Sequence, residues 1–302
     1  MDLGAHVSAA GGVDRAVGRA TAIGAEAIQL FASSPRGWKF KPIPDEKAES
    51  YCKQAAAEGI RSTFLHGSYL VNIGGKPDLV EKSIDSLINH MNAAAQIGAR
   101  GVIFHSGSHK GVGFDAIFEQ AIGVLYTVLD NTDDDVQLII ENCAGLNAQI
   151  GASFDEIGRM IKAVDSPRLT VCLDTEHAFA AGYNLAEPDG IEKTMEEFDT
   201  EIGLERLVVV HANDSKVELG SGIDRHENIG EGFIGIEGFE AIMAHPAFVD
   251  VPFLLEVPGE NRKGPDRPNL DRLKDIRARL GGSGAAIGSD VGNSDFADTD
   301  YS

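Results

Sequence analysis

Six residues of the types that bind transition metals recur along the chain at similar intervals. The intervals are 33 to 45 residues long, and the set combines three histidines with three carboxylates and no cysteine. Imidazole nitrogen and carboxylate oxygen together suit Zn²⁺ or Mn²⁺. We therefore predict a metal centre formed by His66, His105, Glu141, Asp174, His211 and Glu256.

Three further candidate ligands lie in stretches that we expect to be loops. His177 comes three residues after Asp174, and Asp224 and His226 flank Arg225. One tetrahedral zinc ion needs about four ligands, or three protein ligands and a water. Nine candidates, with one carboxylate shared between ions, are enough for two or three ions.

Short apolar runs lead into the six recurring residues and are typical of buried parallel strands. Apolar residues at helical spacing predict helices between them, most clearly over residues 77–98 and also over 13–23, 46–58, 114–129, 154–164 and 267–280. Eight alternations of strand and helix indicate an α/β fold, a closed (β/α)₈ TIM barrel. The strands are expected over residues 3–7, 27–31, 62–66, 101–105, 136–142, 169–174, 207–213 and 252–257.

An open, doubly wound sheet is the alternative, but the first strand is followed only by Ala10-Gly11-Gly12 and not by a Gly-x-Gly-x-x-Gly turn. In a TIM barrel the carboxyl ends of the strands form the active site. The six recurring residues fall at the ends of six consecutive strands, where packing alone would favour apolar side chains. This shared position favours a common site.

The chain is strongly acidic, with 26 basic and 47 acidic residues and a net charge of −21. A shortage of cations argues against nucleic acid as a partner, because phosphate contacts need Lys and Arg. The alternative is a halophilic protein, whose acidic surface stays soluble when salt screens its repulsion. Residues 281–302 carry four aspartates and no Lys or Arg, so we expect a disordered acidic tail. The expected barrel domain, residues 1–280, still carries −17.

Three widely spaced cysteines do not form a disulfide framework and fit a reducing cytoplasm. No apolar run approaches the roughly 18 residues that a membrane span requires. The first residues lack the basic and apolar regions of a secretory signal. We therefore expect a cytoplasmic protein without a membrane partner.

Several residues near the expected strand ends are candidates for substrate contact. Tyr69 lies just past His66, in a loop position that favours exposure to substrate. Arg36 shares its loop with the single Trp, a combination that suits a phosphodiester backbone and stacked bases, although a loop anchor is the alternative. For Lys216, contact with an anionic substrate and an exposed ion pair are equally compatible with the sequence.

Three other polar residues are not expected to bind metal. His6 is expected to line the pocket without binding metal. His90 lies among polar residues of its helix and is expected to be solvated. Glu176 is a candidate general base, but a solvated loop carboxylate is the favoured interpretation.

Seven motifs, in order, resemble the endonuclease IV family of zinc-dependent apurinic/apyrimidinic endonucleases (deoxyribonuclease IV) of base-excision repair. The likeness extends over about residues 1–280. In the sixth-strand motif, Glu176 stands where the family commonly has Cys. The matching stretches are residues 4–12, 66–72, 104–109, 141–145, 174–183, 211–216 and 224–232.

The resemblance implies a (β/α)₈ barrel with three Zn²⁺ ions, with Mn²⁺ as an alternative in one site. Hydroxide between the first two ions would attack the phosphorus 5′ to an abasic sugar, and the third ion would stabilise the leaving 3′-oxygen. Glu256 would orient the hydroxide and Glu141 would bridge two ions. The implied ligand sets are His66, His105 and Glu141; Glu141, Asp174, His211 and Glu256; and His177, Asp224 and His226.

The resemblance also implies a monomer that acts on duplex DNA containing an abasic site. Family members flip the abasic nucleotide out of the stack, and Arg36 and Tyr69 match the positions that insert into the DNA. Lys216 and Arg225 would add local positive charge inside the acidic shell. The alternatives are a metal-dependent sugar isomerase or epimerase on the same barrel, and a non-catalytic binder of abasic DNA.

Overall fold

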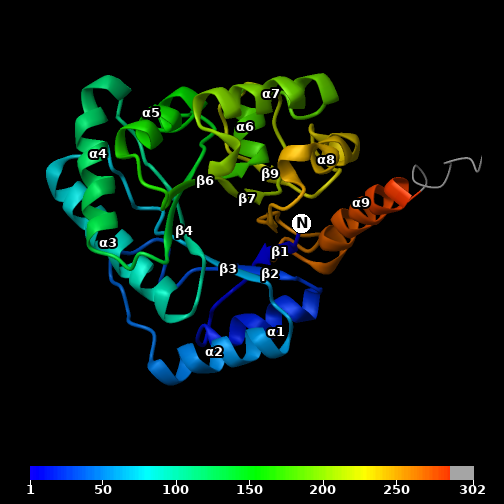
Figure 1. The fold of residues 1–302 in the computed structure, drawn as a ribbon, viewed down its shortest axis with the longest axis horizontal. Coiled ribbons are helices and arrows are strands. Elements are labelled where there is room, and N and C mark those ends of the chain that lie inside the picture. Colours follow the sequence, from blue (N-terminus) through cyan, green and yellow to red (C-terminus); the bar gives the residue numbers. More distant parts are fainter. Residues whose placement is uncertain (286–302) are drawn as a thin grey trace, which may run out of the picture.

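The computed structural model describes the backbone of residues 1–285 and the side chains of residues 1–281. Eight parallel strands close into a barrel in the order β1-β10-β7-β6-β5-β4-β3-β2, and helices surround it (Figure 1). The predicted TIM barrel is therefore confirmed. The barrel strands are β1 (Leu3–His6), β2 (Ala27–Leu30), β3 (Ser62–His66), β4 (Gly101–His105), β5 (Gln137–Glu141), β6 (Leu169–Asp174), β7 (Leu207–His211) and β10 (Phe253–Leu255).

The helices form because apolar residues recur at helical spacing and bury one side against the strands. In α3 (Pro77–Gln96), Leu87, Met91 and Ala94 are fully buried. The other helices are α1 (Asp14–Ile23), α2 (Asp45–Ala57), α4 (Phe114–Asp130), α5 (Phe154–Val164), α6 (Thr175–Ala181), α7 (Pro188–Glu201), α8 (Gly235–Ala244) and α9 (Arg267–Ala285).

Short elements complete the connections, and some of them were not expected. Two 3₁₀ turns cover Leu204–Arg206 and Pro246–Phe248, and a small antiparallel pair joins β8 (Asp214–Ser215) to β9 (His226–Glu227). Helices α6, α7 and α8 form where the apolar spacing predicts no defined helix. Their apolar stripes are short, and α6 begins directly at the end of a strand.

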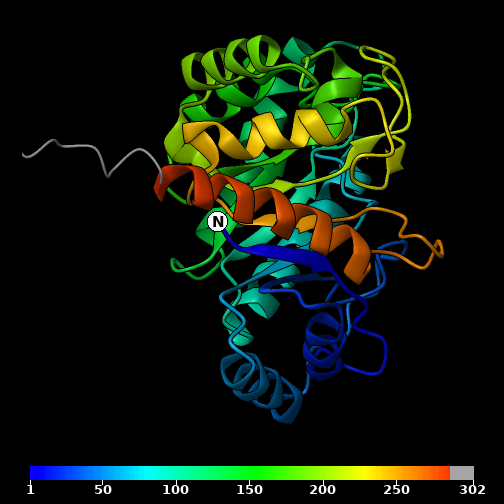
Figure 2. The same ribbon diagram turned by 90° about the vertical axis from the view of Figure 1, so that its right-hand side faces the viewer.

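The last helix corrects the expected boundary of the tail. The apolar spacing predicts that α9 ends at residue 280, but the helix continues to Ala285, five residues into the expected tail. Leu280 of α9 packs on the core, and the helical backbone continues past it. Residues 286–302, where the rest of the predicted tail falls, lie outside the described residues. Figure 2 shows α9 lying beside β1.

The interior of the barrel is filled by one small apolar cluster, separate from the larger core between strands and helices. Each barrel strand except β1 contributes one fully buried side chain to it. At β1 the corresponding position is Gly4, where an added Cβ would lie 2.1 Å from the carbonyl oxygen of Ala27. The members of the interior cluster are Ala27, Phe64, Ile103, Ile139, Cys172, Val209 and Leu254.

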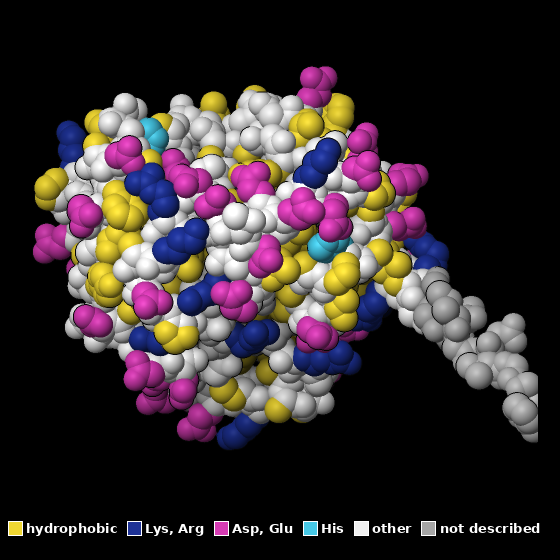
Figure 3. Space-filling view, turned by 45° about the horizontal axis from the view of Figure 1, so that its top comes forward, with side chains coloured by type: hydrophobic (Ala, Val, Ile, Leu, Met, Phe, Trp, Pro, Cys, Tyr) yellow, Lys and Arg dark blue, Asp and Glu magenta, His cyan; other side chains and the backbone are white. Residues whose placement is uncertain are grey.

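The surface carries the acidity that the composition indicates. Figure 3 shows acidic side chains scattered over one face, with basic side chains between them. Among the described residues, none of the helices combines the length and apolar character needed to cross a bilayer.

Candidate metal centre

The candidate ligands form the layer next to the interior cluster, at the carboxyl ends of the strands. His105 stands two residues after Ile103, and the same spacing relates the other strand-end ligands to the interior cluster. Alternate side chains of a strand share one face, so a residue two positions on also points inward. The strand register then pairs His105 with Glu141 and Asp174 with His211. Glu256 follows the end of β10 directly.

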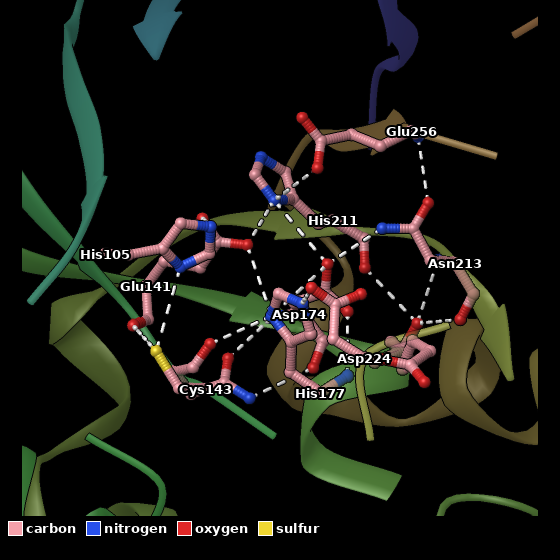
Figure 4. Close-up of polar contacts among 12 residues, drawn as sticks. His105, Glu141, Cys143, Asp174, His177, His211, Asn213, Asp224 and Glu256 are labelled. Carbon is pink, nitrogen blue, oxygen red and sulfur yellow. Dashed lines mark hydrogen bonds and ion pairs between the residues drawn. The ribbon is translucent and has the colours of Figure 1, made fainter. Parts of the chain in front are cut away.

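Glu141 is the centre of this layer and is fully buried. Its Oε2 lies 3.1 Å from His66 Nε2 and 3.5 Å from His105 Nε2. Its Oε1 lies 2.9 Å from His211 Nδ1 and 3.4 Å from His177 Nδ1 (Figure 4). Burial alone would raise the pKa of Glu141, but His105 and His211 outweigh it and hold the pKa well below its usual value. Each oxygen of the ionised Glu141 carboxylate therefore faces different metal-binding side chains. A carboxylate that bridges two ions requires this arrangement.

In each of the five candidate histidine ligands, one ring nitrogen contacts a neighbouring protein atom and the other points into the centre. Such a partner sets the tautomer and orientation that a metal-binding imidazole needs. Four of these nitrogens donate to oxygen: His66 Nδ1 to Gly67 O at 2.9 Å, His177 Nδ1 to Asn142 O at 3.0 Å, His211 Nε2 to Gln29 Oε1 at 2.7 Å, and His226 Nδ1 to Glu256 O at 3.3 Å. The fifth, His105 Nδ1, lies 3.7 Å from Cys143 Sγ.

The two carboxylates beside Glu141 are oriented by neutral side chains. Glu256 Oε1 accepts hydrogen bonds from His6 Nδ1 at 2.7 Å and from Gln29 Nε2 at 2.6 Å. Asn213 donates to Asp174 Oδ2 at 2.8 Å and accepts from the Glu256 backbone at 2.8 Å. His6 thus contacts the candidate ligand Glu256 directly. The roles of Gln29 and Asn213 were not anticipated, although Gln29 follows Ala27 at the same two-residue spacing as the ligands.

His177, Asp224 and His226 also meet in space. Asp224 Oδ2 lies 3.4 Å from His177 Nε2, and Asp224 Oδ1 lies 3.5 Å from His226 Nε2. His177 is not in a loop but in α6, because the Asp174 carboxylate accepts from its backbone N–H and caps the helix. Burial lowers the pKa of His177, but Asp174 and Asp224 outweigh it and raise the pKa well above its usual value.

Within residues 1–281, donor atoms that lie within 4.8 Å of one another fall into three groups. Two coincide with the first two expected ligand sets, and the third brings Glu176 and Asp174 to His177 and His226. Within residues 1–281, all ion pairs of the buried carboxylates Glu141 and Asp174 run to histidines and none to Lys or Arg. The nitrogen and oxygen donors, their fixed orientations and the lack of a balancing Lys or Arg all fit bound cations. That these residues are ligands stays a prediction.

Two expectations about solvation were wrong. Glu176 is fully buried, because the loop that carries Arg225 covers it and the Arg225 N–H donates to its Oε1 at 3.0 Å. Burial and the neighbouring Asp174 raise the pKa of Glu176 to about 7. His90 is also buried: its Nδ1 donates to Ser86 O at 2.7 Å, and its Nε2 accepts from the Ser33 hydroxyl at 3.2 Å.

A pocket of about 870 Å³ opens over the centre. It is lined by residues of the centre and by Trp38, Tyr69, Lys110 and Arg225 from the surrounding loops. Tyr69 is half exposed, with its ring 5.5 Å from that of His66. A pocket of this kind leaves the potential ligands accessible from solvent and offers aromatic and cationic contacts at its rim.

The remaining expected contact residues lie on neighbouring loops. Arg36 is exposed, and the carbonyl of the preceding Pro35 accepts from the Tyr69 N–H at 2.9 Å, which ties the two loops together. Lys216 is about half exposed and forms an ion pair with Glu227 at 3.0 Å. The exposed ion pair is therefore present, and contact of Lys216 with an anionic substrate stays a prediction.

Comparison with known proteins places the chain in a family. A family model described as a xylose isomerase-like TIM barrel matches residues 17–278. A relative from Halothermothrix orenii, named probable endonuclease 4, is 42% identical over 260 residues, which cover 85% of this chain and 94% of the relative. A relative of the same name from Natronomonas pharaonis is 40% identical, and the match covers 91% and 98%.

Solved structures agree with these relatives. The crystal structure of endonuclease IV from Thermus thermophilus matches with a TM-score of 0.81 and 36% identity, over 93% of this chain and all of that one. A D-tagatose 3-epimerase-like protein matches with a TM-score of 0.70 but only 15% identity, which is a likeness of fold alone. The chain belongs to the endonuclease IV family of xylose isomerase-like TIM barrels, so the resemblance seen in the sequence motifs is confirmed.

Proposed function

We propose that this protein is a DNA-repair endonuclease that hydrolyses the phosphodiester bond 5′ to an abasic site in duplex DNA. The products would be a 3′-hydroxyl and a 5′-deoxyribose phosphate, and the centre would hold three Zn²⁺ ions, with Mn²⁺ as an alternative in one site. The observation that carries the proposal is the buried Glu141 shared between two groups of ligand-type side chains, in a chain 42% identical to a protein named probable endonuclease 4.

The residues of this chain fit separate tasks in such a reaction. Bound zinc ions would supply Lewis acidity for phosphate oxygens and a nucleophile at neutral pH. Glu141 would hold two ions together through its two oxygens. Because His6 and Gln29 both donate to Glu256 Oε1, the other oxygen, which lies 3.5 Å from His211 Nδ1, would be left to contact an ion and to orient the attacking hydroxide. His6 and Gln29 would thereby fix the direction in which that hydroxide is oriented.

The loops around the pocket fit the recognition of damaged DNA. Tyr69 presents a half-exposed ring at the rim of the pocket, next to the loop that carries Arg36. An aromatic side chain in this position can stack on a base exposed by opening the duplex. A pocket of about 870 Å³ is large enough to receive a flipped sugar and its phosphate. Small-sugar chemistry would not need these loops.

Metal content measured beside cleavage of a duplex with one abasic site tests the proposal. We expect three metal equivalents per chain, a nick 5′ to the lesion, and loss of activity with a chelator. Glu256→Gln should lower the rate by about 10²- to 10⁴-fold, the range of a lost general acid–base contact. Glu260→Gln, which removes an exposed carboxylate four residues away, is the matched control. Cutting by Glu256→Gln at the wild-type rate would falsify the role given to Glu256.

The acidic surface makes a second test informative. Binding through many Lys and Arg contacts weakens steeply with salt, because it depends on counterion release. In this chain we expect affinity to rest mainly on metal–phosphate bonds and shape, with local help from Arg36, Lys216 and Arg225. Nuclease activity should therefore persist across a salt series, and a steep loss by about 0.2 M salt would contradict this view.

A further inference from the structure

Glu176 has a carboxylate oxygen for which residues 1–281 provide no hydrogen-bond partner. It is fully buried in the first turn of α6. Its Oε1 accepts from the Arg225 N–H at 3.0 Å and from the Ser215 hydroxyl at 3.4 Å. Its Oε2 is buried without a hydrogen-bond partner. Leaving a buried acceptor unpaired costs the free energy of removing it from water, so an atom of this kind indicates a missing partner.

A second buried atom without a hydrogen bond belongs to the neighbouring His226, whose only ion-pair contacts at that atom within residues 1–281 are carboxylates at 3.5 and 3.7 Å. His226 Nε2 is also buried without a hydrogen-bond partner. Since His226 Nδ1 donates to Glu256 O, Nε2 of the neutral ring carries the lone pair. Two atoms that both offer lone pairs cannot hydrogen-bond to each other, but a cation between them satisfies both.

The spacing of the donors fits one ion. Asp174, Glu176, His177 and His226 each offer one donor atom, and these atoms all lie within 4.8 Å of one another. Two donors bound to the same ion at about 2.0–2.2 Å cannot be more than roughly 4.4 Å apart, so little movement is needed. Glu176 is not among the residues that line the pocket over the centre, whereas His177, His226 and Asp224 are. It therefore approaches the ion from the protein side.

We propose that Glu176 supplies a carboxylate oxygen to the third cation of the centre, beside His177 and His226. This rests on the proposed function and adds a ligand to the set of His177, Asp224 and His226. Asp224 is about half exposed on a loop, whereas Glu176 is held in a buried helix turn. The third metal site would then have the buried carboxylate of Glu176 as well as the loop carboxylate of Asp224. Through its other oxygen, Glu176 also connects the ion to the loop that carries Asp224 and Arg225.

Metal titrations of the full-length protein test this proposal. Glu176→Gln keeps an oxygen that can accept from Arg225 but removes the charge. With Zn²⁺ and separately Mn²⁺ in chelator-buffered solutions, we expect one of three equivalents to bind about 10- to 100-fold more weakly, with the other two unchanged. Glu218→Gln, which removes an exposed charge from the loop before Asp224, is the matched control and should bind all three as the wild type does.

A second variant separates ligation from charge and covers the case of poor folding by the first. Glu176→Asp keeps the charge but withdraws the oxygens by one methylene, so it should also lose affinity at one site. Retention of all three equivalents at wild-type affinity in either variant would overturn the proposal. If the wild type binds no third equivalent or fails to cut abasic DNA, the proposed function itself fails. With three ions and normal cutting in the wild type, the variants decide on Glu176 alone.

Discussion

A partly buried ion pair fastens the last helix to the first strand, and its loss should be measurable as stability. Glu26, just before β2, accepts from Arg277 of α9 through both oxygens, at 2.6 and 2.7 Å. The same carboxylate accepts from the Leu3 N–H of β1 at 3.0 Å, and Arg277 also donates to the Met1 carbonyl at 3.0 Å. One carboxylate thus joins α9, β1 and the start of β2, the region seen in Figure 2.

The lowered pKa of Glu26 limits the loss of stability that we expect when the ion pair is broken. Burial alone would raise the pKa of Glu26, but Arg277 and the Leu3 N–H outweigh it and lower the pKa from 4.5 to about 2. At about 1.4 kcal/mol per pH unit this corresponds to roughly 3 kcal/mol at most. Because the side chains of Glu26 and Arg277 are 23% and 34% exposed, solvent screening reduces the expected contribution to about 1–2 kcal/mol.

The sign of the pH dependence follows from the lowered pKa. The unfolded chain protonates Glu26 near 4.5, whereas the folded chain keeps it ionised to about 2. The stabilisation is therefore complete above a pH of about 5 and is lost as pH falls toward 2. At a pH of about 3, less than about half of it should remain.

Urea unfolding of Glu26→Gln measures the contribution directly. Chelator is present at each pH, so that loss of metal does not enter the comparison. We expect the variant to be less stable than wild type by about 1–2 kcal/mol at a pH of about 7, with a smaller difference at about 3. Glu49→Gln breaks an exposed pair with Lys53 in α2 and should cost less than about 0.5 kcal/mol. Equal losses for Glu26→Gln at both pH values would refute the linkage between the ion pair and stability.

The buried His90, the packed Gly4 and the imidazoles of the centre lead to further expectations. His90→Phe keeps a buried ring but loses the acceptor for Ser33, which lies in the loop that carries Arg36. We expect that hydrogen bond to hold the loop in place for DNA, so KM for abasic DNA should rise several-fold with kcat unchanged. A fall in kcat alone would contradict this role. Gly4→Ala places a methyl group 2.1 Å from the Ala27 carbonyl, and thermal unfolding should reveal a loss of roughly 3 kcal/mol or more. The raised pKa of His177 makes protons compete with cations. Metal affinity by chelator competition should thus rise between a pH of about 6 and about 8, and a flat profile would argue against ligation.

The strand-end ligands could be predicted because their signal is local. Each follows a short buried run, and the inward direction of alternate side chains brings them to one layer without knowledge of any distant contact. Glu176 and His90 carry no such signal. Glu176 is buried by a loop about fifty residues later in the chain, and His90 by a loop more than fifty residues earlier. Polar neighbours in the sequence indicate solvent for both, and only the folded chain shows otherwise.

The residues that orient the candidate ligands were also hard to predict. Asn213 joins the Asp174 carboxylate to the Glu256 backbone at the end of a different strand, and an isolated Asn near a strand end has many other uses. Helix α6 was missed for a similar reason, since its cap is the Asp174 side chain, which had already been given the role of a ligand.

The ring of strands is closed by its first and last members, with Ala5 of β1 beside Leu255 of β10. The hydrogen bond from His6 to Glu256 crosses that seam between residues 250 positions apart. During synthesis, the carboxylate that we expect to aim the attacking water cannot be set until nearly the whole chain has left the ribosome. A nascent chain would then be expected to gain nuclease activity only after the segment around Glu256 has joined the first strand.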